Sequence, residues 1–508
     1  MTHHLTTTTK HHLRASWIAT VLNLDWPSKQ SLAISNEAER VALQQRELTA
    51  MLDEAVSLRM NAVFFQVRPC ADAFYRSTLV PWSRYLTGTL GQDPGFDPLA
   101  FVIEQAHRRN LELHAWFNPY RVSMDRSPAT VEQLNRVAPG RPASVYQAQP
   151  QWIASASDRF VIDPGIPQAR SAIVEAVMEV ARNYDIDGVH FDDYFYYESA
   201  ASPLDDSATF ARYGQDFADK GDWRRDNTYQ LIRELSAALR EFDPGIKFGV
   251  SPAGVWRNQS VDPLGSATRH GAPNYDVGFA DTRRWVHEEL LDYILPQVYW
   301  TFDLEVAPFE VVAKWWADTV RGRNVHLYIG EALYKVGVAS AREPGWAEDE
   351  GITQISRQLT WNTDNPQVSG SVLFRHLSLR APQAARAVAA IRAQVWQHPA
   401  LIPAMAWKTG RAPQPPVAVR REETAAGTQL QWQDHPANTP GQTRYYAVYR
   451  SAPGKALDTT RADCLVATVR CESASAHWTD ANPDAGAVTY GVTALDRGHF
   501  ESAATLAW

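Results

Sequence analysis

The sequence is poor in cysteine and lacks both long apolar runs and excess positive charge, and each shortage excludes a class of protein. Three cysteines (Cys70, Cys464 and Cys471) in 508 residues are too few for a disulfide framework or a cysteine metal cluster. No apolar run is long enough to cross a bilayer. The formal net charge of −8 gives no basis for electrostatic binding to nucleic acid. Neither H-x-H nor H-E-x-x-H occurs, so we expect no metal and no other cofactor.

Aromatic residues, in contrast, are abundant: the chain contains 18 Trp and 19 Tyr. Some of these rings belong to cores, but Trp and Tyr also line clefts that stack flat, half-apolar ligands such as sugars. The hydrophobic content of 45% and the charged content of 21% are typical of globular proteins. A chain of 508 residues is too long for one ordinary hydrophobic core, so we predict two or three domains.

Eight short apolar segments, each ending in polar or aromatic residues, recur along the first three quarters of the chain. Amphipathic stretches such as QRELTAMLDEAVSLRM (45–60) and NTYQLIRELSAALREF (227–242) separate them and return apolar residues every three to four positions. Strands alternating with helices indicate βαβ units, and eight units predict an α/β fold, a (β/α)8 TIM barrel over residues 12–405. The predicted strands are 15–23, 61–69, 111–119, 188–194, 246–254, 292–300, 325–333 and 371–377.

The composition changes after the barrel. The stretch TGRAPQPPVAVRR contains a Pro-rich linker, placed at residues 406–415. Beyond it, segments with period-two alternation are separated by turn residues, which predicts a small all-β sandwich over 416–508. Trp432, the strand YYAVYR (445–450) and the segment YGVTALDRGHFES (490–502) make this region similar to a fibronectin type III module. We interpret the module as a spacer or docking unit.

Polar side chains occur at the ends of the predicted strands, where barrel enzymes build their active sites. The largest insertions, 120–158 and 195–226, follow the third and fourth strands and would lie at the same face. So many polar residues at the ends of buried strands are hard to explain by core packing. The candidates for substrate binding are Arg68, His114, Trp116, Asn118, Arg121, His190, Trp256, Gln297, Tyr299 and Trp300.

The fourth strand ends in two adjacent carboxylates, Asp192 and Asp193, within DGVHFDDYFYY. Strand alternation puts His190 and Asp192 on the face toward the barrel axis and Val189 and Phe191 on the face toward the helices. Asp193 lies where the strand becomes a loop, so its direction stays open. Two close carboxylates repel, and sheltering them raises the pKa of one, which gives the acid and base that glycoside cleavage needs. The alternative for Asp193 is a structural role, in which it caps the next segment or forms an ion pair with an arginine such as Arg121.

A second carboxylate is also available from the seventh strand, where Glu331 in YIGEALY faces Asp192 across the predicted mouth. We therefore take Asp192, Asp193 and Glu331 as the candidate catalytic residues. The spacing of the two groups, which separates retaining from inverting reactions, is not encoded in the sequence. Glu331 also fits a structural role as the partner of an arginine.

Seven motifs in order resemble the glycosyl-hydrolase-like family 10 domain over about residues 12–400: RASWIAT, NAVFFQVRP with DAFY, HAWFNPYR, DGVHFDDYFY, FGVSPAGVWRN, ILPQVYW and YIGEALY. The resemblance implies a TIM barrel and a glycosidase acting on the N-acetylated aminosugar polymer of bacterial peptidoglycan. In such a substrate the acetamido group can be the internal nucleophile. One aspartate would then orient it while the other protonates the leaving oxygen, and this scheme stands level with the two-carboxylate scheme.

The compartment and two rival functions stay open at this point. Family members are typically exported, yet the N-terminal MTHHLTTTTKHHLRAS has no apolar signal core, and by itself favours the cytoplasm. One rival is a metal-dependent deacetylase or hydrolase using His114, His190, Asp192 and Asp193. The other is a barrel that binds carbohydrate without cleaving it. We expect a polysaccharide partner, no nucleic acid and no transmembrane segment; the oligomeric state is undetermined.

Overall fold

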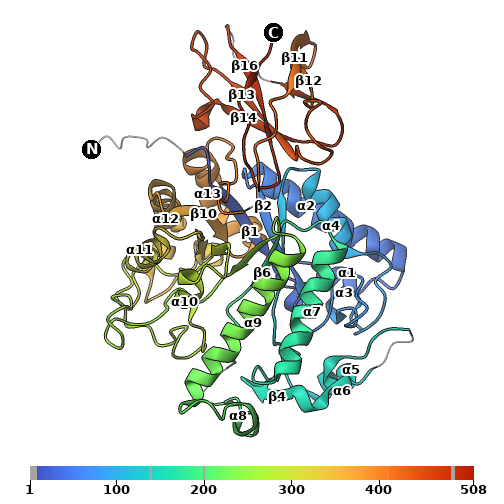
Figure 1. The fold of residues 1–508 in the computed structure, drawn as a ribbon, viewed down its shortest axis with the longest axis vertical. Coiled ribbons are helices and arrows are strands. Elements are labelled where there is room, and N and C mark those ends of the chain that lie inside the picture. The colour runs from blue at the N-terminus through green and yellow to red at the C-terminus, as the bar shows by residue number, and fades with distance from the viewer. Residues whose placement is uncertain (1–8, 137–139, 198–200, 409, 482–486) are drawn as a thin grey trace.

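Eight parallel strands close into one barrel, as the alternation of strands and helices predicted (Figure 1). The computed structural model describes residues 9–136, 140–197, 201–408, 410–481 and 487–508. The order around the barrel is β1-β10-β9-β8-β7-β6-β3-β2. The strands are β1 (Leu13–Ile18), β2 (Ala62–Arg68), β3 (Glu112–Phe117), β6 (Gly188–Phe191), β7 (Lys247–Val250), β8 (Tyr293–Ile294), β9 (His326–Glu331) and β10 (Val368–Leu373).

Several predicted strands differ from the observed ones in their ends, and two of the differences have a clear local cause. The eighth strand lies at 368–373, about three residues before its predicted place, because the chain turns into a 3-10 helix, η6 (His376–Arg380), directly after it. The predicted 292–300 strand retains only two residues as β8. Pro296 has no N–H to donate and interrupts the ladder, which resumes as a bridge between Gln297 and Gly330.

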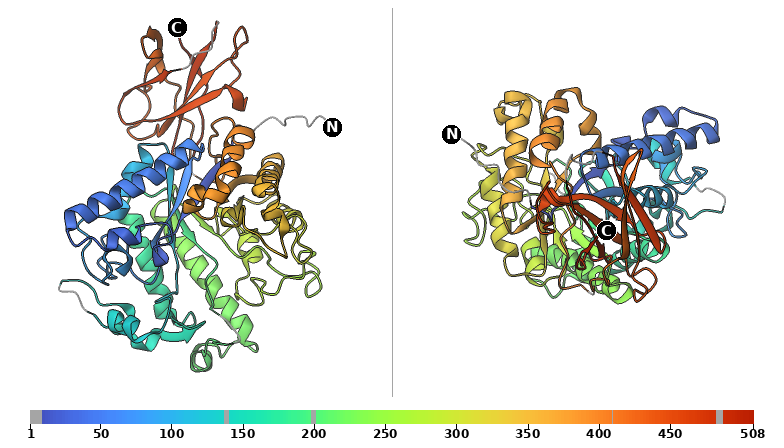
Figure 2. Two further views of the ribbon diagram at one scale, coloured as in Figure 1. Left: turned by 180° about the vertical axis from the view of Figure 1, so that it is seen from behind. Right: turned by 90° about the horizontal axis from the view of Figure 1, so that it is seen from above.

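Helices cover the outside of the barrel (Figure 2). Their starts follow the capping residues: Asn36, Asp97 and Asp219 each accept a backbone N–H with their side chains at the first turn of a long helix. None of the helices in the described residues is long and apolar enough to span a membrane. The helices are α1 (Lys29–Leu32), α2 (Glu37–Ser57), α3 (Arg84–Thr87), α4 (Pro98–His107), α7 (Pro167–Asn183), α9 (Lys220–Phe242), α10 (Thr282–His287), α11 (Phe309–Val320), α12 (Ile352–Asp364) and α13 (Ala385–Ala390).

Two separate cores result from the alternation of side chains along the strands. The outer core, between strands and helices, contains Val189 and Phe191, whereas the inner core on the barrel axis contains Trp17, Phe64 and Tyr293. His190 also faces the axis, because its ring contacts Trp17 and Tyr293. The predicted directions of these fourth-strand side chains are therefore confirmed.

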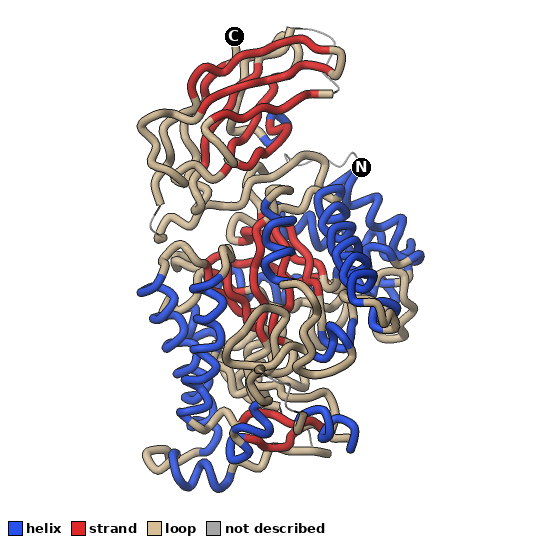
Figure 3. The backbone as a smooth tube through the Cα atoms, turned by 90° about the vertical axis from the view of Figure 1, so that its right-hand side faces the viewer, coloured by secondary structure: helices blue, strands red, loops and turns tan. Residues whose placement is uncertain are grey.

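The enlarged loop after β3 contains two short helices, α5 (Pro128–Leu134) and α6 (Val145–Ala148), and a hairpin of β4 (Ile153–Ala156) and β5 (Arg159–Ile162). The loop after β6 contains α8 (Ser207–Tyr213). Residues 137–139 and 198–200 of these loops lie outside the described residues. The hairpin and α8 lie together at the end of the barrel opposite the C-terminal sandwich (Figures 1 and 3), so both insertions extend the same rim.

The C-terminal region consists of two antiparallel sheets, ordered β11-β12-β15 and β14-β13-β16-β17. Val419, Leu430, Trp432, Tyr446 and Val492 fill the space between them, which confirms a sandwich. The predicted domain boundaries stay predictions, and Thr409 of the predicted linker lies outside the described residues, as do 482–486. The strands are β11 (Val417–Thr424), β12 (Gly427–Gln433), β13 (Tyr445–Arg450), β14 (Leu465–Arg470), β15 (Ser475–Asp480), β16 (Tyr490–Leu495) and β17 (Thr505–Leu506).

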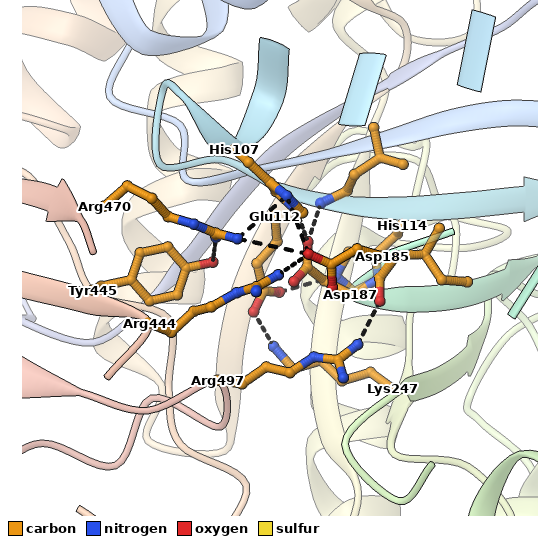
Figure 4. Close-up of polar contacts among 12 residues, drawn as sticks. His107, Glu112, His114, Asp185, Asp187, Lys247, Arg444, Tyr445, Arg470 and Arg497 are labelled. Carbon is orange, nitrogen blue, oxygen red and sulfur yellow. Dashed lines mark hydrogen bonds and ion pairs between the residues drawn. The ribbon is translucent and has the colours of Figure 1, made fainter. Parts of the chain in front are cut away.

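Charged contacts join the sandwich to the amino-terminal rim of the barrel (Figure 4). Arg444 of the sandwich pairs with Asp185 at 2.5 Å, and Arg470 approaches the same carboxylate at 3.9 Å. Arg497 pairs with Asp243 at 2.6 Å and donates to a backbone carbonyl before β6. Three arginines on one side therefore meet carboxylates on the other, and the sandwich is held against the barrel floor.

We predict that Asp185→Asn loosens this contact, because two arginines lose their shared carboxylate. Partly exposed ion pairs contribute about 0.5–1 kcal/mol each, so the expected effect is modest and increases at low salt. The measurement is the rate of protease cleavage in the linker at 406–415. Asp364→Asn, at an exposed position on α12, is the control, and equal cleavage rates for the two variants would contradict the prediction.

Candidate active site

A cavity of about 390 Å³ opens at the carboxyl ends of the barrel strands. Its size suits a small-molecule or sugar subsite. The wall is largely aromatic, and the polar groups in it are two carboxylates, two guanidinium groups, two amides and one serine hydroxyl. The residues lining it include Trp17, Gln66, Trp116, Arg121, Arg159, Asp192, Asp193, Tyr194, Ser251, Gln297, Tyr299, Tyr334 and Phe374.

Asp192 is held in place by a single amide. Asn118 Nδ2 donates to both carboxylate oxygens, at 3.1 and 3.0 Å. The opposite side of this amide is also fixed, because Asn118 Oδ1 accepts from the backbone N–H of Arg121 at 3.0 Å and from the Tyr197 hydroxyl at 2.9 Å. Asn118 can therefore only present its N–H groups to Asp192, and this orients the carboxylate.

The two aspartates differ in electrostatic surroundings. Burial raises the pKa of Asp192, while Arg121 and the hydrogen bonds from Asn118 oppose the increase. Burial, and then the charge of Asp192, raise the pKa of Asp193 to about 7, with only a hydrogen bond from Gln297 as a strong opposing influence. The charge of Asp192 adds to burial at Asp193, whereas Arg121 and Asn118 oppose the increase at Asp192, so Asp193 is the carboxyl group better placed to hold a proton near neutral pH.

Arg121 and Arg68 arrange the loop that follows β3. Arg68 Nη1 donates to the backbone carbonyls of Asn118 and Pro119, at 2.9 and 3.0 Å. Arg121 Nε donates to the Pro69 carbonyl at 2.8 Å, and its guanidinium lies 5.6 Å from the centre of the Tyr194 ring. Arg121 lines the cavity, whereas Arg68 is buried behind it as a support for Asn118.

The two predicted histidines lie below the cavity on the barrel axis. His190 Nε2 is 2.9 Å from Ser251 Oγ, and His114 Nδ1 is 3.0 Å from the Tyr293 hydroxyl. Burial keeps the pKa of His190 well below its ordinary value, with help from the neighbouring His114. Neither histidine lines the cavity; they act on it through Ser251.

Glu331 is completely buried and does not line the cavity, contrary to its expected position across the mouth. Asn362 Nδ2 donates to its Oε1 at 2.7 Å. Burial raises the pKa of Glu331 to about 8, so it is protonated at neutral pH. Tyr299 and Phe374, which stack at 5.8 Å, do line the cavity near the end of β9. Glu331 therefore does not join Asp192 and Asp193 in the cavity.

The two tryptophans on the β7 side also lie outside the cavity lining. Trp256 stacks on Trp315 with ring centres 5.6 Å apart and donates to Asp281 at 3.0 Å. Trp300 packs against the His270 ring at 4.9 Å. The structure therefore brings Trp116, Arg121, Asp192, Asp193, Gln297 and Tyr299 together and places Arg68, His114, Asn118, His190, Trp256, Trp300 and Glu331 around them.

The cavity also contains residues that were not among the sequence candidates. Trp17 follows the strand alternation of β1 toward the axis, so the period-two pattern contained a signal for it. Arg159 comes from the β4–β5 hairpin, inside an insertion with weak periodicity. Tyr334 and Phe374 follow β9 and β10. No sequence pattern indicates that Arg159, Tyr334 and Phe374 reach this cavity.

A closed (β/α)8 barrel with an acidic pair in an aromatic pocket at its carboxyl rim has the architecture of a glycosidase-type barrel. The model of the family described as glycosyl hydrolase-like 10 matches residues 12–348, and the chain belongs to this family. "Glycosyl hydrolase DigH" of Escherichia coli (strain K12) is 49% identical over 382 residues, 75% of this chain and 87% of that protein. "Glycosyl hydrolase YngK" of Bacillus subtilis (strain 168) is 43% identical over 498 residues, 97% of this chain and 92% of that protein.

Among solved structures, an endo-1,4-beta-mannanase from Rhizomucor miehei matches with a TM-score of 0.44 and 10% identity, over 77% of this chain and 98% of that one. The family and the two bacterial relatives support a function of the glycoside hydrolase type. The names of the relatives specify neither a linkage nor a polymer.

We predict that Asp193→Asn makes stability less dependent on pH. A folded-state pKa of about 7 against an ordinary 3.8 means that the folded protein holds a proton that the unfolded chain releases between those values. Wild-type stability from this group therefore decreases as pH rises from about 4 to about 7, on the order of 2–4 kcal/mol. The measurement is urea unfolding at pH 5 and pH 8. Equal pH dependence in wild type and variant would refute the assignment.

Proposed function

We propose that this protein hydrolyses glycosidic bonds in an N-acetylated aminosugar polymer, the glycan strands of bacterial peptidoglycan. The observation that carries the proposal is the pair Asp192 and Asp193. They are neighbours in the chain, burial raises the pKa of both carboxyl groups, and no other carboxylate is found among the described residues that line the cavity. A protonated acid beside an ionised carboxylate is the arrangement that glycoside cleavage requires.

The adjacency of the two aspartates favours help from the substrate itself. In the ordinary scheme two carboxyl groups flank the scissile bond, and in inverting enzymes they leave room for a water molecule between them. Asp192 and Asp193 both enter the cavity from the end of β6, so they approach the sugar from one side. An acetamido oxygen on the sugar can supply the nucleophile that is missing on the other side. This requirement selects an N-acetylated sugar.

The roles follow from the different surroundings of the two carboxyl groups. Asp193, which holds the proton, donates it to the leaving glycosidic oxygen as the C–O bond breaks. Asp192, ionised and oriented by Asn118, accepts the acetamido N–H and directs the acetamido oxygen to the anomeric carbon. Water then attacks the anomeric carbon of the cyclic intermediate, and the Asp193 carboxylate takes the proton of that water. The sugar leaves with its acetamido group restored.

The aromatic wall and the charges fit this substrate class. Trp17, Trp116, Tyr299 and Phe374 offer ring faces to the apolar faces of pyranose rings. Arg121 and Arg159 place two positive charges in the cavity, which suits a glycan carrying carboxylates such as the lactyl groups of muramic acid. Among the described residues, no group of three His, Cys, Asp or Glu side chains is placed to hold a metal ion.

We predict that Asp192→Asn and Asp193→Asn each lower turnover of purified sacculi about 10²–10⁴-fold, as expected for loss of acid–base or orienting carboxylates. Glu331→Gln keeps turnover near wild type, because the amide resembles a buried carboxyl group that is already protonated. The measurement is mass spectrometry of fragments released from intact and amidase-treated sacculi. Release by neither the wild type nor any variant would favour a barrel that binds glycan without cleaving it.

We also predict that kcat/KM decreases as pH rises through about 7. Asp193 must carry its proton to act as the acid, and its pKa is about 7. Gln297→Leu removes a hydrogen bond that stabilises the Asp193 carboxylate, so the alkaline limb of the profile moves to higher pH. The measurement is the pH dependence of kcat/KM for both proteins. A shift in the opposite direction would assign the limb to another group.

A further inference from the structure

A continuous row of polar side chains runs along the barrel axis beneath the cavity. From the cavity downward it comprises Ser251, His190, Tyr293, His114 and Glu112, all with at most 2% of their surface exposed. The successive distances are 2.9 Å from Ser251 Oγ to His190 Nε2, 3.2 Å from His190 Nδ1 to the Tyr293 hydroxyl, 3.0 Å on to His114 Nδ1, and 3.1 Å from His114 Nε2 to Glu112 Oε2. Because each group is buried, its donors and acceptors must be matched within the row.

The lower end of the row fixes the proton on His114. Burial alone would disfavour a charged Glu112, but Lys247, His114 and the sandwich residue His499 keep its pKa well below the ordinary value. His499 Nε2 lies 2.7 Å from Glu112 Oε1. Lys247 pairs with the same oxygen (Figure 4). An ionised carboxylate only accepts hydrogen bonds. His114 Nε2 must therefore be the donor, and in the neutral ring Nδ1 accepts from the Tyr293 hydroxyl.

The upper end of the row fixes the same direction independently. Trp17 Nε1 lies 3.3 Å from His190 Nε2, and an indole nitrogen can only donate. His190 Nε2 is therefore an acceptor, and its proton is on Nδ1, which donates to the Tyr293 oxygen. The single Tyr293 proton is then directed to His114 Nδ1 at 3.0 Å, in preference to the Val189 carbonyl at 3.4 Å. Both ends of the row thus require that, in every hydrogen bond, the donor lies on the cavity side and the acceptor on the side of the barrel floor.

This direction determines what Ser251 presents to the cavity. Its single hydroxyl proton is given to His190 Nε2 at 2.9 Å, where it shares the lone pair of that nitrogen with the more distant Trp17 N–H at 3.3 Å; the Phe191 carbonyl at 3.5 Å is the farther acceptor. Ser251 lines the cavity, and the lone pairs of Oγ remain free there. A hydroxyl without this buried row could rotate and serve as donor or acceptor, whereas Ser251 is fixed as an acceptor.

We propose that Ser251 Oγ accepts a hydrogen bond from a hydroxyl group of the substrate sugar and selects for that hydroxyl. The inference rests on the proposed function, in which Asp192 already takes the acetamido N–H, so the donor left for Ser251 is an O–H. His190, Tyr293 and His114 are positioning residues, because none of them lines the cavity and His190 contacts the cavity residues Ser251 and Trp17. A sugar that lacks the hydroxyl leaves a buried acceptor without a partner, which weakens its binding.

The direction of the row can be tested without substrate. Long-range ¹H–¹⁵N correlation spectra of the full-length labelled protein report the tautomer of each histidine ring, and His190→Gln and His114→Gln assign the signals. We expect two neutral rings of opposite kind, with the proton on Nδ1 of His190 and on Nε2 of His114. A proton on Nε2 of His190 would overturn the proposal, because Ser251 would then have to accept from the ring.

The selection of a hydroxyl is tested with a peptide-free tetrasaccharide of the glycan strand and with analogues in which fluorine replaces one hydroxyl at a time. For Ser251→Ala we expect kcat/KM to be about 2- to 10-fold lower with the tetrasaccharide, as for the loss of one hydrogen bond, with most of the change in KM. One fluoro analogue should lose activity with wild type but lose nothing further with Ser251→Ala. Ser251→Thr, which keeps the hydroxyl, should restore discrimination against that analogue.

Ser16→Ala is the matched control, since Ser16 is a buried serine that bonds a histidine, His376, at 2.7 Å but does not line the cavity. Ser16→Ala should change stability without changing any preference among the analogues. Equal losses for every analogue in wild type and Ser251→Ala would overturn the inference while leaving the glycosidase proposal intact. If wild type turns over none of these sugars, calorimetric binding of the same set decides the inference, and absence of binding overturns it together with the proposed function.

Discussion

Closure of eight parallel strands into a barrel is the constraint on which the site depends. All strands run the same way, so their carboxyl ends meet at one rim. Asp192 after β6, Ser251 after β7, Gln297 after β8 and Trp116 on β3 come from segments far apart in the sequence and line one cavity for this reason. The parallel register between β3 and β6, which pairs Trp116 with His190, then sets Asn118 beside Asp192.

The carboxyl rim of the barrel holds two acidic groups close together, and their negative charges repel each other. Two neighbouring carboxylates are sheltered in one cavity, and the protein orients only Asp192 strongly, through Asn118, with Arg121 nearby. Asp193 keeps a raised pKa as a result. This raised pKa reduces stability at neutral pH, and under the proposed function it supplies a proton donor beside a second carboxylate, a common compromise between stability and function at active sites.

The opposite end of the barrel is equally polar but serves packing. Glu112 at the start of β3 is matched by Lys247 at the start of β7 (Figure 4). His499 from the sandwich completes the set. A carboxylate buried on the axis is tolerated only with such partners. The sandwich therefore covers the barrel floor, where its arginines meet Asp185 and Asp243, and none of its described residues lines the cavity. Through His499 the sandwich also contacts Glu112, the lowest member of the axial row.

The sequence by itself determined the eight strands, the direction of His190 on the fourth strand and the acidic pair at its end, because strand periodicity and burial are local properties. It also predicted the sandwich, from its alternating strands. Only the tertiary structure decided that Glu331 is buried outside the cavity, that Arg159 and Tyr334 reach into it, and that Trp256 and Trp300 remain outside it. These outcomes depend on how far each loop turns beyond the last hydrogen bond of its strand. That turning is set by long-range packing, which the local periodicity of the sequence does not encode.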